Sequence, residues 1–163
     1  MSEVELARLA GFFAGEGNIT ISGGKWPTLY AALGNTEKMW VEQFHSLFSG
    51  SFYVEEPKYA GAKLMFRWRV SGKNAVNFLQ IIQPFLIGEK AEQLKLGLAF
   101  QKVKNAEIPK GGFGRKTRIT TWDKLQQFRG EMKNLRCAAA ETNRRDAIPL
   151  RNDSPTLEVI PVR

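Results

Sequence analysis

The sequence contains few of the residues that build disulfides, zinc centres and nucleophilic active sites. Among 163 residues there is one cysteine, Cys137, and one histidine, His45. A single cysteine excludes a disulfide within the chain, and a lone histidine without such a partner argues against a zinc site or a catalytic triad. The sequence therefore gives no support to a disulfide scaffold, a histidine-ligated metal or a serine-type mechanism.

Long hydrophobic runs and nucleotide-binding loops are missing as well. No apolar stretch approaches the length that spans a bilayer, and no GxxxxGKS/T phosphate loop occurs. The acidic N-terminus does not resemble a signal peptide. These absences predict an intracellular protein, in the cytoplasm or an organelle matrix, with no nucleotide cofactor.

Acidic residues are outnumbered by basic ones. The chain has 16 Asp and Glu against 24 Lys and Arg, a net charge of +8, and 43% hydrophobic residues. The hydrophobic content is enough for the core of one domain, and the charge suggests a polyanionic partner such as a nucleic acid. The alternative is that the positive charge only keeps the protein in solution.

The N-terminal residues predict a helix with small side chains along one face. Ser2 and Glu5 have the spacing of a capping box, and apolar residues recur at helical intervals over 6–13. Small residues at 10, 11, 14 and 15 would let another backbone approach closely.

Glycines bracket a single carboxylate at the end of this helix. Gly15 and Gly17 flank Glu16, and polar and apolar residues alternate directly afterwards. The C-terminus of a helix carries partial negative charge and carbonyls without intrahelical partners, so a carboxylate there suits a divalent cation. The alternative is a capped helix with an exposed glutamate.

Periodicity places the other elements. Strand-like alternation predicts strands at 18–22, 28–33, 51–54 and 63–70, and helical spacing predicts helices at 36–48, 73–83, 89–104 and 120–143. In the fourth strand the predicted buried residues are Leu64, Phe66, Trp68 and Val70. The order is helix, two strands, helix, two strands and then helices, which is an α+β pattern.

The stretch from Leu9 to Gly17 resembles the LAGLIDADG motif of homing endonucleases. Its Leu-Ala-Gly-Phe core is intact and Gly-Glu-Gly closes it, while Ala14 stands where an acidic residue is common and Glu16 replaces the more usual aspartate. The second exchange keeps the carboxylate and lengthens its reach by one methylene. A matching Gln-Pro-Phe-Leu segment at 83–86 and the order of elements extend the resemblance over residues 4–143.

The resemblance implies a fold and an oligomeric state. The fold is αββαββα, with a four-stranded antiparallel DNA-binding sheet and C-terminal helices, over residues 1–143, and an irregular tail follows at 144–163. The motif occurs once, as in the single-motif branch of the family, whose members work as homodimers. The motif helix would then pack against its copy through Leu9, Ala10, Gly11, Phe13 and Ala14.

The resemblance also implies a catalytic site. Glu16 and the Gly15 carbonyl would hold Mg²⁺, and phosphate oxygens and water would complete an oxygen-rich shell. Family members place a basic residue near the metal, for which Lys90 and Lys38 are the candidates, and a polar residue that positions water, for which Asn35 is the candidate. The alternative for each lysine is an exposed helix residue.

Polar side chains on one face of the sheet would read DNA in the major groove, because a strand presents every second residue to that face. Arg67 and Arg69 are the strongest candidates for guanine or phosphate. The other predicted DNA-binding residues are Asn18, Thr20, Ser22, Lys25, Thr28, Tyr30 and Lys63 on the sheet, and Arg115 and Lys116 in a basic loop. The alternative is that these residues only solvate the sheet face and the loop.

Together these inferences predict a homodimeric, Mg²⁺-dependent endonuclease that cuts double-stranded DNA at a long pseudo-palindromic site, as in intron homing. A cleavage-inactive DNA-binding regulator or an RNA maturase on the same scaffold is the first alternative. A structural basic protein that binds nucleic acid without sequence preference is the second.

Overall fold

A computed structural model describes residues 1–24, 27–57, 59–107 and 119–145. The predicted DNA-binding residues Lys25, Arg115 and Lys116 lie outside these ranges, as does the tail from residue 146 onward.

The order of helices and strands follows the sequence prediction. The strands are β1 (Gly17–Ser22), β2 (Thr28–Asn35), β3 (Ser51–Glu55) and β4 (Met65–Ser71). The helices are α1 (Glu3–Glu16), α2 (Lys38–Phe48), α3 (Gly72–Ile82), α4 (Gly88–Glu107) and α5 (Ile119–Arg145), with a short 3₁₀ turn, η1 (Gln83–Phe85), before α4. The helix α5 continues to Arg145, so the first two residues of the predicted irregular tail are helical.

The strands form one antiparallel sheet in the order β1-β2-β4-β3. The chain leaves β2 through α2, forms β3 at the outer edge and returns as β4 beside β2. This confirms the predicted α+β architecture with a four-stranded antiparallel sheet. One edge of the sheet is β1 and the other is β3.

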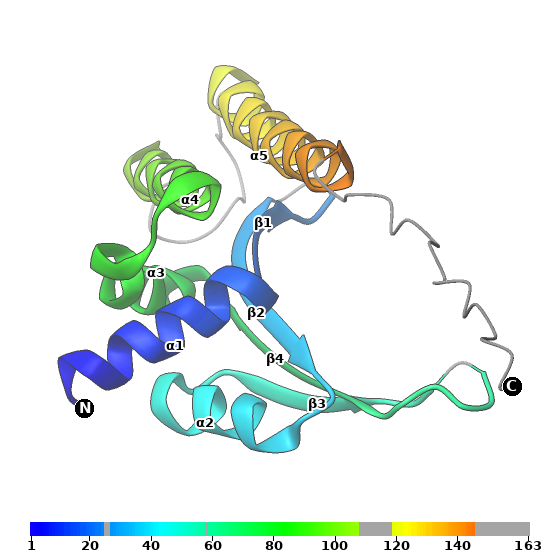
Figure 1. The fold of residues 1–163 in the computed structure, drawn as a ribbon. Coiled ribbons are helices and arrows are strands. Elements are labelled where there is room, and N and C mark those ends of the chain that lie inside the picture. The colour runs from blue at the N-terminus through cyan, green and yellow to red at the C-terminus, as the bar shows by residue number, and fades with distance from the viewer. Residues whose placement is uncertain (25–26, 58, 108–118, 146–163) are drawn as a thin grey trace, which may run out of the picture.

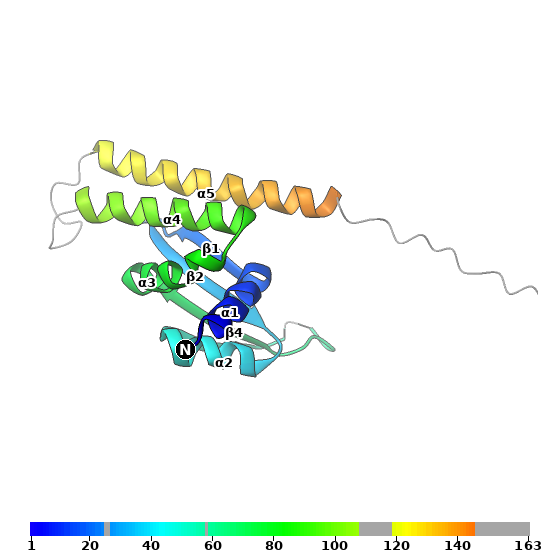
Figure 2. The same cartoon turned by 60° about the vertical axis from the view of Figure 1, so that its left-hand side comes forward.

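The helices α1, α2 and α3 lie on one face of the curved sheet, and the opposite face has no described helix over it (Figure 1). The helix α5 packs against both α4 and the edge strand β1, and the two helices run side by side (Figure 2). The sheet thus has a covered apolar face and an open polar face. Along β1 and β2, buried and half-buried residues alternate accordingly.

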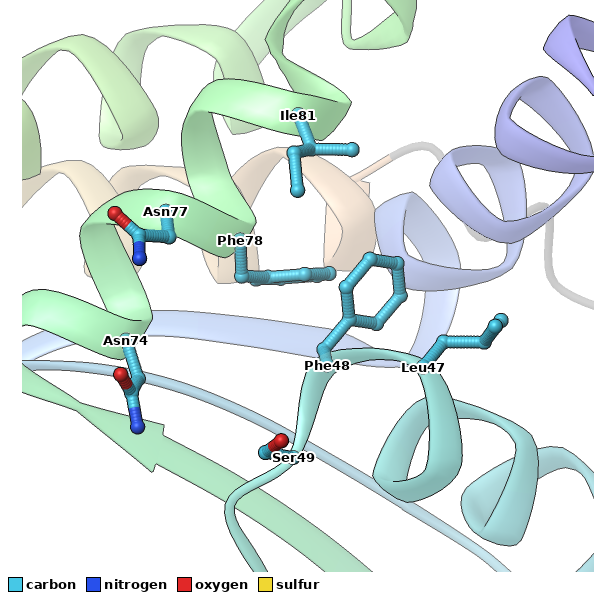
Figure 3. Close-up of a pocket in the computed structure, with 7 residues that line it drawn as sticks. All are labelled: Leu47, Phe48, Ser49, Asn74, Asn77, Phe78 and Ile81. Carbon is cyan, nitrogen blue, oxygen red and sulfur yellow. The ribbon is translucent and has the colours of Figure 1, made fainter. Parts of the chain in front are cut away.

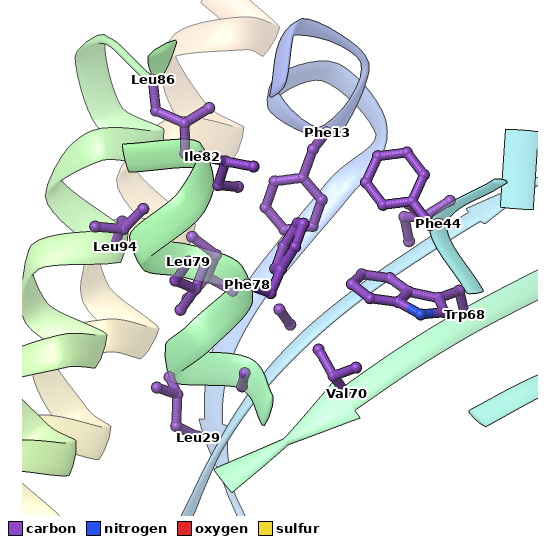
Figure 4. Packing of buried hydrophobic residues seen from close by; sticks show 14 of the residues in the cluster. Phe13, Leu29, Phe44, Trp68, Val70, Phe78, Leu79, Ile82, Leu86 and Leu94 are labelled. Atoms are coloured by element: carbon purple, nitrogen blue, oxygen red, sulfur yellow. The ribbon is translucent and has the colours of Figure 1, made fainter. Parts of the chain in front are cut away.

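Aromatic side chains from four elements form the centre of the core (Figure 4). The ring of Phe78 meets Phe13 and Trp68 edge-on, each at 4.9 Å between centroids, and Phe44 lies 5.3 Å from Trp68. All four side chains are buried. Burial of such large apolar surfaces supplies most of the driving force for folding, and edge-on ring pairs add to it.

One predicted core residue is misplaced. The strand β4 begins at Met65 rather than at residue 63, so Leu64 precedes it and is 39% exposed. The chain turns at 59–61, where Gly61 has a φ of 86°, and enters the sheet only afterwards. The predicted strand at 63–70 therefore begins two residues too early, at Lys63 and Leu64.

Candidate functional site

The glycine-bracketed carboxylate lies at the junction of α1 and β1. Ser2 and Glu5 form the predicted capping box at the start of α1, and Glu16 is its last residue. The backbone N–H of Gly17 donates to the carbonyl of Phe13. A Cβ on Gly17 would lie 2.3 Å from that carbonyl oxygen and 2.4 Å from the Phe13 ring, so only glycine fits this turn.

Lys90 is held against the same junction. Its ammonium donates a hydrogen bond of 2.7 Å to the carbonyl oxygen of Gly17, the residue after Glu16. Burial lowers the pKa of Lys90, the nearby Arg136 lowers it further, and Glu89 opposes both effects. The start of α4 thus places a cation beside the end of α1. The catalytic role of Lys90 stays a prediction.

Arg136 is a member of this cluster that the sequence analysis did not find. It comes from α5, and its guanidinium donates to the hydroxyl oxygen of Thr20 on β1 at 3.3 Å. Helical spacing predicted α5, but 116 residues separate the two partners, and no local pattern indicates that this face of α5 reaches β1. The packing of α5 along β1 supplies that information.

The residues around Glu16 fit a divalent cation bound through oxygen. Glu16 is exposed, and a Cβ on the adjacent Gly15 would have no neighbour within 4 Å, so both groups face open space. Carbonyls of the last helical turn lack intrahelical partners and can act as ligands. Within the described ranges no three His, Cys, Asp or Glu side chains gather to hold a metal. The chain therefore offers an incomplete oxygen shell of the kind that substrate oxygens and water complete.

The other two predicted catalytic residues have local roles. Lys38 forms an ion pair of 2.8 Å with Glu42 on α2, and the two side chains are 55% and 51% exposed. The side-chain oxygen of Asn35 accepts the backbone N–H of Glu37 at 2.8 Å and shapes the turn into α2. That turn displaces the predicted helix start, and Glu37 is the N-cap of α2. Neither the ammonium of Lys38 nor the side-chain oxygen of Asn35 is part of the cluster with Lys90.

The open face of the sheet carries most of the predicted DNA-binding residues. Pairing sets Thr20 opposite Tyr30 on the neighbouring strand and Arg67 opposite Gly34. Along the strands, the half-buried residues of this face are Asn18, Thr20, Ser22, Thr28, Tyr30, Arg67 and Arg69. Lys63 precedes β4 in an exposed loop rather than in the strand, and the hydroxyl of Thr28 accepts a hydrogen bond from Lys104 at 3.3 Å.

The side chain of Arg67 is oriented by its contacts with neighbouring strands. Its Nε donates to a carboxylate oxygen of Glu55 on β3, and the side chain extends over Gly34 on β2. A Cβ on Gly34 would lie 3.0 Å from Nη1 of Arg67. Because Glu55 engages Nε, the two terminal nitrogens remain for the fork geometry that recognises guanine or phosphate.

Arg69 is fixed by stacking. Its guanidinium lies 3.7 Å from the centroid of the Tyr30 ring on β2. This cation–π contact already restricts the side chain of Arg69, so the residue would lose less conformational entropy on binding a ligand. The open face thus presents two oriented arginines.

Only two of the five residues predicted to form the dimer contact are exposed on α1. Leu9, Ala10 and Phe13 are fully buried within the single chain, so their side chains belong to the core. Gly11 and Ala14 are exposed, and a Cβ on Gly11 would meet no atom within 4 Å. Two large apolar residues are also strongly exposed, Val4 on α1 at 79% and Ile87 before α4 at 86%.

A pocket of about 230 Å³ lies between the end of α2 and α3 (Figure 3). Phe48 and Phe78 form its wall beside Leu47 and Ile81, with Asn74 and Asn77 along α3. Neither Glu16 nor Lys90 lines it, so the cluster described above is a separate site. No described helix has the length and apolar content needed to cross a membrane.

No protein-family model and no curated protein matches the sequence. Solved structures do match the fold. The homing endonuclease I-CvuI, in complex with DNA, has a TM-score of 0.63 at 15% identity, covering 82% of either chain. The archaeal intron-encoded homing endonuclease I-Vdi141I, also complexed with DNA, has a TM-score of 0.62 at 14% identity over 82% of this chain and 84% of its own.

A third match is the homing endonuclease I-TnaI, with a TM-score of 0.60 at 12% identity over 83% of this chain and 96% of its own. The LAGLIDADG meganuclease I-AabMI, bound to uncleaved DNA, matches at a TM-score of 0.57 and 16% identity, and only 43% of its chain is covered. The chain therefore has the fold of the LAGLIDADG homing endonucleases, which confirms the resemblance found at Leu9 to Gly17.

Proposed function

We propose that this protein is a site-specific endonuclease for double-stranded DNA that depends on a divalent metal ion, Mg²⁺, and acts as a homodimer. The observation that carries the proposal is the cluster at the start of β1. There Glu16 ends α1, Lys90 binds the Gly17 carbonyl, and the open sheet face with Arg67 begins directly alongside. DNA-bound homing endonucleases of the same fold support it.

Each group in the cluster has a chemical task. Glu16 and the Gly15 carbonyl would hold Mg²⁺, which supplies charge neutralisation at the phosphate and activation of water. Lys90 places a positive charge beside the same junction, where it would stabilise the negative charge that develops on the phosphate oxygens. Hydrolysis by water needs no covalent intermediate with the protein, in keeping with the single exposed Cys137 and lone His45.

The sheet would deliver the scissile phosphate to this cluster by binding the adjacent bases. A curved antiparallel sheet can enter the major groove, where every second side chain contacts base edges. Arg67, whose Nε donates to Glu55, would make a bidentate contact with guanine through its terminal nitrogens. Arg69, stacked on Tyr30, is the second such group.

A second copy of the chain would complete the enzyme. One protomer supplies one Glu16, and a double-strand cut needs a reaction on each strand. The exposed small residues Gly11 and Ala14 let two α1 helices approach, and the exposed Val4 and Ile87 add apolar surface to that contact. A two-fold arrangement predicts a pseudo-palindromic target with one half-site per protomer.

The test is selection of cleaved sites from a randomised duplex library in the presence of Mg²⁺. We expect a long, pseudo-symmetric consensus, and we expect Glu16→Gln to bind that consensus without cutting it. The matched control is Glu92→Gln, which neutralises an exposed glutamate paired with Lys95 on α4 and should cut normally.

The same experiment separates the alternatives. A wild-type protein that binds one duplex sequence tightly but never cuts it would be a DNA-binding regulator. Two features favour this second candidate: no three His, Cys, Asp or Glu side chains gather within the described ranges, and the side-chain oxygen of Asn35 is already engaged. A preference for intron RNA would indicate a maturase, and salt-dependent binding without sequence preference would indicate a structural role.

A further inference from the structure

A basic groove runs between α5 and the edge strand β1. It has a volume of about 410 Å³, and Thr20 and Ser22 form its β1 side. The opposite side is formed by α5, with Gln126, Arg129, Lys133 and Arg136. Figures 1 and 2 show α5 lying over the end of the sheet that contains β1.

The charges of this groove share one sign. Arg129, Lys133 and Arg136 follow one another at intervals of four and three residues, so they lie on one face of α5. All three are exposed, and no carboxylate is among the described residues that line the groove. Three neighbouring cations facing polar strand residues form a surface that attracts a linear polyanion.

Hydrogen-bond donors accompany the charges. Gln126 accepts a hydrogen bond of 3.4 Å from Arg129, which orients that guanidinium, and Arg136 donates to Thr20 across the groove. The buried amide nitrogen of Gln126 has no hydrogen-bond partner among the described residues. Donors and cations therefore outnumber acceptors here, as they do where phosphate oxygens bind.

The groove is continuous with the open face of the sheet. Thr20 and Ser22 belong to both, because β1 is the edge strand and its polar side chains point to that face. Arg136 lies at the end of the groove near Lys90, and Arg129 lies seven residues earlier in α5. Seven residues of helix rise about 10 Å, which spans roughly three phosphates of one DNA strand along its axis.

We infer that the groove between α5 and β1 binds the sugar–phosphate backbone of duplex DNA that flanks the bases contacted by the sheet, with Arg129 and Lys133 as phosphate ligands. This inference rests on the proposed function for its choice of duplex DNA. The groove adds affinity and fixes the register of the DNA on the sheet without reading sequence. Arg136, at the inner end, links the groove to the cluster around Lys90.

The test compares Arg129→Gln/Lys133→Gln with a control of equal charge loss, Lys95→Gln/Lys102→Gln. In the control, Lys95 pairs with Glu92 and Lys102 lines a hollow between α3 and α4, away from β1. Affinity for duplex DNA is measured by fluorescence anisotropy over a range of salt concentrations. Each lost phosphate contact lowers the slope of log affinity against log salt by about 0.9.

We expect the groove variant to lose a slope of about 1.8 for its two contacts and to keep the base preference of the wild type. The control variant should keep the slope. Equal slopes for the two variants, or a changed base preference in the groove variant, would overturn the inference. Loss of binding to an RNA stem with an unchanged slope on duplex DNA would overturn its assignment to DNA. Circular dichroism verifies folding, which substitutions at exposed positions should leave intact.

Failure of this inference and failure of the proposed function give different results. If the wild type cuts a selected target and both variants show the same salt slope, the endonuclease proposal stands and the groove inference is wrong. If the wild type cuts no duplex and only the groove variant has a reduced salt slope, the groove inference stands for a DNA-binding protein and the endonuclease proposal is wrong.

Discussion

The ammonium of Lys90 donates a 2.7 Å hydrogen bond to the carbonyl oxygen of Gly17, one residue beyond the carboxylate-bearing Glu16. This bond joins two segments that are 73 residues apart and fixes a half-buried cation at the end of α1. It therefore holds the start of α4 against the junction of α1 and β1.

The pKa of Lys90 should be measurable in the intact protein. Burial favours its neutral form, so Lys90 should lose its proton at a lower pH than an exposed lysine does. We expect the ¹³Cε resonance of Lys90 to titrate below the range of a free lysine side chain, and kcat/KM for DNA cleavage to fall over the same range on the alkaline side. A titration of Lys90 in the range of a free lysine side chain would contradict this assignment.

Substitution of Arg136 should shift that titration upward. Arg136 is a like charge that lowers the pKa of Lys90, so Arg136→Gln removes a repulsion and should raise the pKa. The alkaline limb of the cleavage profile should move to higher pH in the same direction. The matched control is Lys124→Gln, which neutralises a cation of α5 that lies outside the groove and is not among the charges acting on Lys90.

The turn at Gly17 should tolerate no side chain. In Gly17→Ala the new Cβ would collide with the carbonyl oxygen and ring of Phe13, which costs about 1–3 kcal/mol or more of stability. Thermal denaturation should show a lower Tm than in the wild type. Gly130→Ala, at an open position inside α5, should instead gain about 0.5–1 kcal/mol, because alanine favours helix.

Arg67 should contribute base specificity rather than general affinity. Arg67→Ala should lose about 1–3 kcal/mol of discrimination at one base pair in each half-site, since a bidentate contact would be removed. Glu55→Gln should weaken the same preference, because Glu55 orients the guanidinium. Binding to a panel of single-base variants of the selected target measures both effects, and a uniform loss of affinity would make Arg67 a phosphate contact instead.

Gly11 should be essential for dimerisation. A leucine there would keep two α1 helices apart, so Gly11→Leu should sediment as a monomer and lose double-strand cleavage. The control is Gly130→Leu, which adds the same side chain at an open position on α5 and should remain dimeric. An unchanged dimer in Gly11→Leu would show that the protomers associate through another surface.

The sequence predicted the elements well because their causes are local. The capping box at Ser2, the alternation along β1 and the glycines around Glu16 depend on neighbours in the chain. The face of α1 was less predictable, since Leu9 and Phe13 are apolar residues that either a core or a dimer would bury. Only tertiary packing shows that they belong to the core.

Partners distant in the sequence were the least predictable part of the site. Lys90 was found through the resemblance, whereas Arg136 and Glu55 gave no local signal. The sequence spacing around an arginine on a helix is the same whether its side chain faces solvent or a neighbouring strand. The brace between Arg67 and Glu55 depends on the register of β3 on β4, which no spacing in the sequence specifies.

The packing of α5 along β1 also protects the sheet from self-association. An uncovered edge strand can recruit a strand from another molecule and start aggregation. The helix α5 occupies the side of β1, and the opposite edge, β3, is five residues long and carries Glu55. Chains shortened before α5 should therefore aggregate through β1, so this helix protects solubility as well as lining the groove.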